Sequence, residues 1–271
     1  MSKIHIIAIA VVVFVVAALG AAYAASQGNY PVIWSPRTVS ATATVGAEPT
    51  EVNVSFTANE DIGDVVIEPV PELADVLTVS PNSFLGVTDG SVNTVTLAFT
   101  ASVDADPETL EGTLHVRPAD GSQTLAKPLP ATVTIVWPSV ASEAGGFTIS
   151  YPGEFQLQEF EAQPQGQNFG LLNSSNPSQG VSVSWRELNP ESLSISEWAD
   201  QQNWPTPDGD WSSIYMLTTI AGREVLQSLD TGSVVLAVDT RIYRVTNGIG
   251  IDPVYVSLDT FTQILNSLEF N

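Results

Sequence analysis

The stretch TEVNVSFT, residues 50–57, alternates polar and apolar side chains from Glu51 onward. A period of two places the apolar side chains on one face of a β-strand and the polar ones on the other. Strands of this kind form sheets with one buried face and one wet face. The stretch therefore predicts a sheet, whose extent depends on the flanking sequence.

The same alternation occurs on both sides of this stretch. It appears at residues 30–36, 38–45, 93–100, 112–117 and 132–137. Turn-forming residues separate the runs, for example Asp89-Gly90-Ser91. Several short strands at this spacing, without a convincing helix, predict an all-β sandwich over residues 30–137.

The segment VDADPETLEGTLHVR, residues 103–117, resembles the late strands of bacterial Ig-like domains. In those domains a loop with a proline leads into a strand of the form Gly-Thr-apolar-x-Val. The segment LPATVTI, residues 129–135, matches the returning strand. Glu108-Thr109-Leu110 departs from the pattern, because such loops usually carry a glycine before a Thr-Tyr pair. The resemblance covers residues 30–137 and implies a spacer or adhesion module without catalysis.

The strand pattern breaks at WPSVASEAGG, residues 137–146. Pro138 ends the last strand, and small residues with a glycine pair follow. This composition predicts a short, fairly flexible linker over residues 138–146.

In the remainder, residues 147–271, some segments have the apolar spacing of strands and others that of helices. Strand-like runs occupy residues 147–153, 155–160, 167–172, 181–185, 213–220, 224–229, 234–239 and 241–245. Residues 194–202 read as a helix, because Ser194 and Glu197 have the spacing of a capping box. A last helical stretch has apolar residues at Val256, Phe261, Ile264, Leu265 and Leu268, with steps of three and four from Phe261 onward. This order predicts an α+β domain with a mainly antiparallel sheet and two helices.

Three segments of this second domain resemble the PsbP-like α/β/α sandwich of small exported proteins and lipoproteins. They are the Ser-x-x-x-Trp-Ala helix at Ser194, the segment IAGRE at residues 220–224, and the ending FTQILNSLEF at residues 261–270. The chain departs from the family at Gly153-Glu154-Phe155, where relatives often carry a tryptophan. The resemblance spans residues 147–271 and implies a fold, which by itself assigns no function.

The N-terminus predicts export. Lys3 precedes an uncharged apolar run at residues 6–25, which ends near the small residues of Ala22-Tyr23-Ala24. This is the pattern of a cleaved signal peptide, while the length of the run also suits an uncleaved anchor. Residues 1–25 are thus a signal peptide or a membrane anchor, with a tether through residues 4–25 in the second case. Both readings place the protein outside the cytoplasm, either secreted or held at the outer face of the cytoplasmic membrane.

The composition is strongly acidic, with a formal net charge of −22 and no cysteine. Residues 30–137 carry 14 acidic and three basic residues, and residues 145–271 carry 15 and four. Such a surface repels nucleic acid and anionic lipid, so neither is expected as a partner. The charge favours solubility, with cation binding or a saline habitat as the alternative. Without cysteine the chain has no disulfide, thiolate metal site or cysteine nucleophile.

Catalytic residue types are scarce. The chain has two histidines, of which His5 lies in the export segment and His115 shares the polar face of a strand with Thr113 and Arg117. Lys127 is the only lysine after Lys3, and no glycine-rich phosphate loop occurs. We therefore expect no enzyme, no cofactor and no histidine metal site.

An acidic loop contains Asp104, Asp106, Glu108 and Glu111. Oxygen-rich loops suit Ca²⁺, but the spacing does not match an EF-hand, which needs a glycine at its sixth and a glutamate at its twelfth position. An ordinary solvated turn is the favoured interpretation, and Ca²⁺ binding is the alternative.

The candidate ligand site is the segment NWPTPDGDW, residues 203–211. Its ligand-binding side chains would be Trp204, Asp208, Asp210 and Trp211. Indoles beside carboxylates bind sugars or cations, and exposed tryptophans favour interfaces. The competing interpretation is that both indoles pack on the core of the second domain and the acids only form a turn.

Three functions remain open on the sequence. The first is a non-catalytic interaction or accessory protein outside the cytoplasm, with an unidentified protein or envelope partner. The second is a binding module for a small ligand, a glycan or a divalent cation, which titration with Ca²⁺ and a glycan panel would detect. The third is a carboxylate-dependent hydrolase, which an activity screen would reveal.

Overall fold

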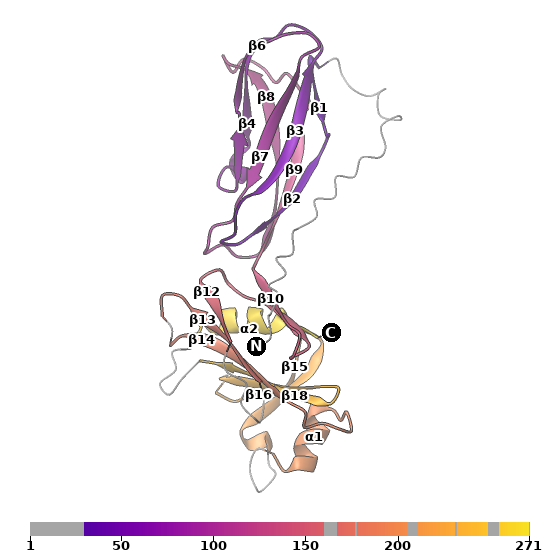
Figure 1. Ribbon diagram of the computed structural model, residues 1–271, viewed down its shortest axis with the longest axis vertical. Coiled ribbons are helices and arrows are strands. Elements are labelled where there is room, and N and C mark those ends of the chain that lie inside the picture. Colours follow the sequence, from indigo (N-terminus) through magenta and orange to yellow (C-terminus); the bar gives the residue numbers. More distant parts are fainter. Residues whose placement is uncertain are drawn as a thin grey trace, which may run out of the picture. The chain divides into compact units, whose positions relative to one another are not determined.

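The computed structural model describes residues 30–159, 167–176, 178–204, 211–230, 232–248 and 255–270. The chain divides into two units, Met1–Val136 and Trp137–Asn271 (Figure 1). The expected export segment, residues 1–25, lies outside the described residues. Within the described ranges, no helix is long and apolar enough to cross a membrane.

The first unit is a sandwich of two sheets, with strand orders β1-β3-β7-β5 and β2-β9-β8-β4-β6. All pairs are antiparallel except β2 with β9, which is parallel. Its elements are β1 (Val32–Ser35), β2 (Val39–Thr44), β3 (Thr50–Ala58), β4 (Gly63–Pro69), the 3-10 helix η1 (Pro71–Leu73), β5 (Leu77–Ser80), β6 (Ser83–Val87), β7 (Val92–Phe99), β8 (Glu108–Pro118) and β9 (Leu129–Val136).

Alternation along the strands builds the core of this sandwich. In β3, Val52, Val54 and Phe56 are buried while the residues between them are exposed or half-buried. Phe56 meets the Trp34 ring edge-on at 5.8 Å between ring centroids. The all-β prediction for this half is confirmed, and the pattern of residues 50–57 is the reason.

Three strands of the first unit, β4, β5 and β6, were not expected from the sequence. In β4 the run Val65-Val66-Ile67 is continuously apolar, so it lacks the period of two. The pairing of β4 with β6 also shifts register between Gly63 and Val65. The bulge in the β4–β6 pairing and the short length of β5 and β6 obscure the polar–apolar alternation from which strands were predicted.

The second unit is α+β, as predicted. A seven-stranded antiparallel sheet has the order β12-β13-β14-β18-β17-β16-β15, and a small sheet has the order β10-β11-β19. The elements are β10 (Ser139–Ser142), β11 (Phe147–Ser150), β12 (Phe155–Glu159), β13 (Gln167–Asn173), β14 (Gly180–Arg186), α1 (Ile195–Gln202), the 3-10 helix η2 (Trp211–Ser213), β15 (Tyr215–Ile220), β16 (Arg223–Ser228), β17 (Ser233–Val238), β18 (Arg241–Asn247), α2 (Leu258–Asn266) and β19 (Glu269–Phe270).

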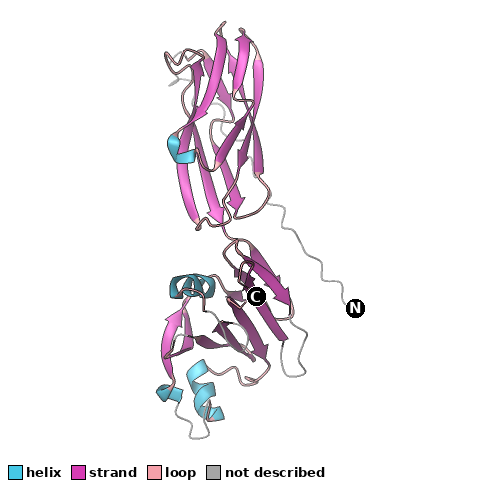
Figure 2. Ribbon diagram, turned by 90° about the vertical axis from the view of Figure 1, so that its left-hand side faces the viewer, coloured by secondary structure: helices cyan, strands magenta, loops and turns pink. Residues whose placement is uncertain are grey.

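The two helices pack on opposite faces of the seven-stranded sheet, and both appear in Figure 2 as cyan coils. Trp198 of α1 joins Leu226 and Val235, which are register partners on β16 and β17, in one buried cluster. The neighbouring pair, Val225 and Leu236, points the other way and meets Leu265 of α2. Side-chain alternation across the strands therefore gives each helix its own half of the core.

The segment expected to be a flexible linker, residues 138–146, instead forms strand β10 and a tight turn. Ser139 through Ser142 pair with Ser150 through Phe147 of β11. The Gly146 N–H donates to the Ser142 carbonyl at 2.7 Å, and Gly146 has a φ of 68°. The glycine pair thus makes a hairpin turn, where the left-handed conformation favours glycine. Small residues and glycine look alike in a linker and in a hairpin, so composition alone did not separate the two.

Helix α1 begins as predicted, with a capping box at Ser194. The Glu197 N–H donates to the Ser194 hydroxyl at 3.3 Å, and the Ser194 N–H donates to the Glu197 carboxylate at 3.0 Å. The Ser194 side chain and backbone hold the pKa of Glu197 below its ordinary value. These bonds satisfy donors that the first helical turn leaves open.

We expect Ser194→Ala to lower the free energy of unfolding of the second unit by about 1 kcal/mol at neutral pH. Because the folded pKa of Glu197 is depressed, the carboxylate stabilises the fold above its unfolded pKa and loses this effect as pH falls through the folded pKa. The difference between wild type and variant should therefore shrink in acid. Thermal unfolding of wild type and variant, at neutral pH and at a pH below the folded pKa of Glu197, tests this. Ser178→Ala, in an exposed turn, is the control. A difference that is unchanged at low pH would contradict the capping role.

Candidate functional site

The two tryptophans of the predicted ligand site lie against the core of α1. The Trp204 ring stands 5.7 Å from Trp198 and 4.8 Å from Tyr215, measured between centroids. Trp211 packs against the same cluster, and its indole N–H donates to the Asp200 carboxylate at 2.7 Å. Their predicted companions, Asp208 and Asp210, lie outside the described residues. Ligand binding at this segment therefore stays a prediction, while packing contacts account for both indoles.

We expect Trp204→Ala to lower the free energy of unfolding of the second unit by about 2 kcal/mol, because a half-buried ring with two aromatic neighbours is removed. Trp204→Phe should recover much of this loss, since it keeps an aromatic ring beside Tyr215. Chemical denaturation of the full chain measures the effect. A stable Trp204→Ala chain that fails to bind a glycan would instead favour a ligand role.

An open hollow of about 480 Å³ adjoins this cluster at the end of β15 and β16. Its polar lining includes Ser228, Asp230, Ser233, Arg244 and Thr246, and Tyr215 and Tyr255 add aromatic rings. The volume lies within the usual range for small-molecule sites, about 300–1,000 Å³. The described lining residues include no histidine or lysine, and Asp230 is the carboxylate among them.

Asp230 and Arg244 place opposite charges in this hollow. The Ser228 hydroxyl, the Gly232 N–H at 3.0 Å and, to a smaller extent, Arg244 hold the pKa of Asp230 below its ordinary value. The carboxylate is therefore ionised at neutral pH. The arrangement suits hydrogen bonding to a polar ligand.

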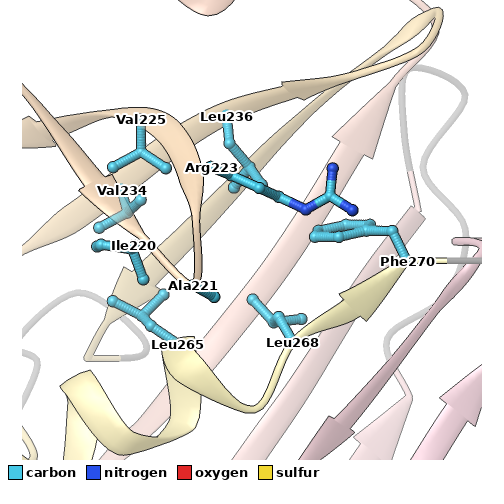
Figure 3. Close-up of a pocket in the computed structure, with 9 residues that line it drawn as sticks. All are labelled: Ile220, Ala221, Arg223, Val225, Val234, Leu236, Leu265, Leu268 and Phe270. Carbon is cyan, nitrogen blue, oxygen red and sulfur yellow. The ribbon is translucent and has the colours of Figure 1, made fainter.

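A second recess lies on the α2 face and holds about 10 Å³. Figure 3 shows its apolar wall of Val225, Val234, Leu236 and Leu265, with the Arg223 guanidinium over the Phe270 ring. The guanidinium carbon is 4.9 Å from the ring centroid. Such a space holds about one water molecule, so this recess is a feature of core packing and not a ligand site.

Strand β15 forms one edge of the seven-stranded sheet and pairs only with β16 among the described strands. Its sequence, YMLTTI, carries no charge and no proline. Met216 is 52% exposed and Leu217 42%, and the flanking Ile214 and Leu229 are 41% and 60% exposed. An apolar strand edge of this kind is uncommon, because exposed edges invite pairing with another chain.

The turn at Ala221-Gly222 determines which backbone groups of β15 face outward. Both residues have positive φ, 49° and 74°, as in the two-residue hairpin that joins Ile220 to Arg223. At the other end the Leu229 N–H donates to the Ile214 carbonyl at 2.9 Å. Hydrogen-bonded and non-bonded pairs alternate in an antiparallel ladder. The N–H and C=O groups of Tyr215, Leu217 and Thr219 therefore point away from β16.

The sequence predicts a strand over residues 213–220, but its position at the edge of the sheet was not predicted. Residues 211–222 carry no charge, but longer uncharged runs occur elsewhere, for example at residues 162–185, so this feature did not single out the edge. Strand order is a property of the whole sheet, so the run alone did not reveal that its far side is open.

The acidic loop and the histidine of the first unit have local partners. Asp104 accepts a hydrogen bond from the Ser102 hydroxyl, which lowers the pKa of this carboxyl. Within the described ranges, no group of three or more His, Asp or Glu side chains is arranged to hold a metal ion. The His115 Nε2 lies 3.1 Å from the Thr113 hydroxyl, on the strand face that the alternation predicted.

The sequence matches no known family, and no curated protein is significantly similar to it. Solved structures with related folds include a protein from Bacteroides thetaiotaomicron, with 14% identity, a TM-score of 0.35, and coverage of 50% of this chain and 48% of that one. The PapD-like domain 7 of human CEP192 has 14% identity, a TM-score of 0.28, and coverage of 39% and 84%. The periplasmic chaperone SfaE has 11% identity, a TM-score of 0.26, and coverage of 58% and 93%. Ig-like and PapD-like sandwiches are thus among the similar structures, and at these TM-scores they carry no argument about function.

Proposed function

We propose that the chain is an extracytoplasmic, non-catalytic interaction protein whose second unit binds a protein partner through the β15 edge. The observation that carries the proposal is the exposed, uncharged strand YMLTTI with its flanking Ile214 and Leu229. Exposed apolar groups that gather at one place on an otherwise polar surface mark interaction sites. This edge carries no charge over residues 211–222, within a strongly acidic chain.

The proposed location outside the cytoplasm is supported by the apolar N-terminal run before Ala22-Tyr23-Ala24. Within this proposal the Ig-like sandwich serves as a spacer, in keeping with the residues 103–117 that resemble such domains. The second unit takes the role of a PsbP-like binding domain. The scarcity of histidine and lysine supports a non-catalytic role.

A photoreactive residue placed at position 216 of the full chain tests this proposal in the producing cell. Position 156 serves as the matched control, because Gln156 is exposed on β12 at the opposite edge of the same sheet. We expect irradiation to give a defined protein adduct from position 216 and none from position 156. Equal adducts at both positions, or none at either, would contradict the proposal.

A second candidate function is the binding of a small polar ligand or glycan in the hollow beside Tyr215. The combination of aromatic rings with Arg244, Asp230 and several hydroxyls in about 480 Å³ favours it. Calorimetric titration with a glycan panel tests this candidate, with Arg244→Ala as the site variant. Heats that are the same for wild type and variant would exclude the hollow as the site.

A further inference from the structure

The β15 edge has the backbone groups that strand addition requires. Tyr215, Leu217 and Thr219 direct three N–H and three C=O groups outward in a regular ladder. The strand has six residues, close to the usual length of strands in sheets. Main-chain hydrogen bonds at such an edge supply affinity, and alternate side chains supply specificity.

The edge strands of the first unit do not combine a regular ladder of outward backbone groups with an uncharged, apolar strand of ordinary length. Strands β1 and β5 have four residues each, and prolines Pro36 and Pro81 follow them. The pairing of edge strand β6 is irregular next to Gly63. Edge strand β2 has six residues, but the residues on its wetter face are serine and threonine. Short length, proline and bulges are the usual means of blocking an edge, and β15 has none of them.

Carboxylates lie near both ends of β15. Glu224 is the register partner of Thr219 at the hairpin end. Asp230 follows Leu229 at the other end, where Leu229 bonds to Ile214. The nearby cation Arg223 is engaged over the Phe270 ring on the α2 face. A strand added at this edge would therefore have an uncharged middle and lie near Glu224 at the hairpin end, while the charge of Asp230 at the other end is opposed by Arg244.

We propose that the β15 edge accepts one extended partner segment, with alternating apolar side chains in its middle and lysine or arginine at both ends. This inference rests on the proposed function and specifies its partner. Charge complementarity favours a basic partner over a second copy of this chain, because each copy brings a formal charge of −22. The middle of the segment pairs with Leu217, the basic end at the hairpin lies near Glu224, and both basic ends complement the net negative charge of the chain.

The test uses the full chain and a fluorescent probe peptide, KKVTVTVKK, in an anisotropy titration at low and physiological salt. Saturable binding is expected that weakens as salt rises. A peptide with glutamates in place of the lysines should bind at least about tenfold more weakly. A probe with methylated amides on alternate residues should not bind, because it cannot complete the ladder.

Leu217→Pro and Leu217→Ala form a matched pair at the centre of the edge. Both variants shorten the side chain, and both leave the backbone hydrogen bonds to β16 in place. Only proline removes the outward N–H. Leu217→Pro should weaken probe binding by about tenfold or more, and Leu217→Ala by about threefold or less. Leu217→Lys keeps the N–H and places a charge in the middle of the edge, so it provides a second loss-of-binding variant if the proline variant unfolds.

Several outcomes overturn the inference. Equal binding of the methylated probe, or equal effects of proline and alanine, would exclude strand addition. A wild-type dimer in ultracentrifugation that Leu217→Pro dissociates would show that a second copy occupies the edge. If no probe binds while position 216 still gives its adduct in cells, the inference fails and the proposed function stands. Probe binding without any cellular adduct would contradict the proposed function and, with it, the inference that a cellular partner uses this edge.

Discussion

Replacement of Phe147 by alanine is expected to lower the free energy of unfolding of the second unit by about 3–5 kcal/mol. Phe147 is completely buried at the start of β11. Its ring meets Trp185 at 5.5 Å, Tyr243 at 6.2 Å and Phe270 at 6.4 Å between centroids. Alanine leaves a cavity at the point where the small sheet meets the large one, and these rigid rings close it poorly.

A loss of this size is a large share of the stability of a small domain, which is about 5–15 kcal/mol in total. Calorimetry of the full chain should show one transition moved to lower temperature and the transition of the first unit unchanged. Tyr255→Ala, at an exposed tyrosine of the same unit, serves as the control and should have little effect. A loss below about 1 kcal/mol for Phe147→Ala would contradict the central place of this ring.

Replacement of Asn189 by aspartate is expected to lower the free energy of unfolding by about 3 kcal/mol at neutral pH. Asn189 is buried, and its amide group donates to the carbonyls of Leu193 and Asp239, each at 2.9 Å. Its side-chain oxygen accepts from the Leu193 N–H, also at 2.9 Å. Aspartate keeps the acceptor but loses both donors, and it brings a charge into a buried site.

The effect of Asn189→Asp should depend on pH. Burial raises the pKa of the new carboxyl in the folded state, so the protonated form is the better tolerated one. The destabilisation should therefore decrease as pH falls through that raised pKa. Asn176→Asp is the matched control, because Asn176 lies in an exposed turn and its side-chain oxygen accepts from the Ser178 N–H. Equal losses for the two variants at neutral pH would contradict the role of Asn189.

Asn189 also matters for the position of α1. Its bonds hold the segment before the helix against the β17–β18 turn, and the Trp198 indole N–H donates to the Leu188 carbonyl at 2.9 Å. Trp198 and Trp204 support Tyr215, the first residue of β15. The contacts that fix α1 therefore also support the start of the proposed docking edge.

Local patterns predicted the elements that have local causes. The period of two placed β3 and β7, and the capping box placed the start of α1 at Ser194. Strands β4 and β6 were missed because a continuous apolar run and a bulge hide the alternation. Strand β19 was missed because its two residues are defined only by pairing with β11, at the other end of the unit.

The site was less predictable than the fold. The sequence indicated Trp204 and Trp211 as a pair, but their contacts with Tyr215 and Asp200 depend on packing between distant elements. The edge at β15 depends on the order of seven strands, which no single run encodes. Residues 211–222 carry no charge, which can be read from the sequence. This lack of charge bears on function only because the strand lies at the edge of the sheet.

Hydrogen exchange of the β15 amides, read by NMR on the full chain, tests the central claim most directly. In the free protein the amides of Tyr215, Leu217 and Thr219 should exchange quickly, while those of Met216, Thr218 and Ile220 are protected by β16. Addition of the KKVTVTVKK probe should protect the first three and leave the others unchanged. If Leu217 and Thr219 are already protected in the free chain, or stay unprotected with the probe bound, the β15 edge is not a docking strand.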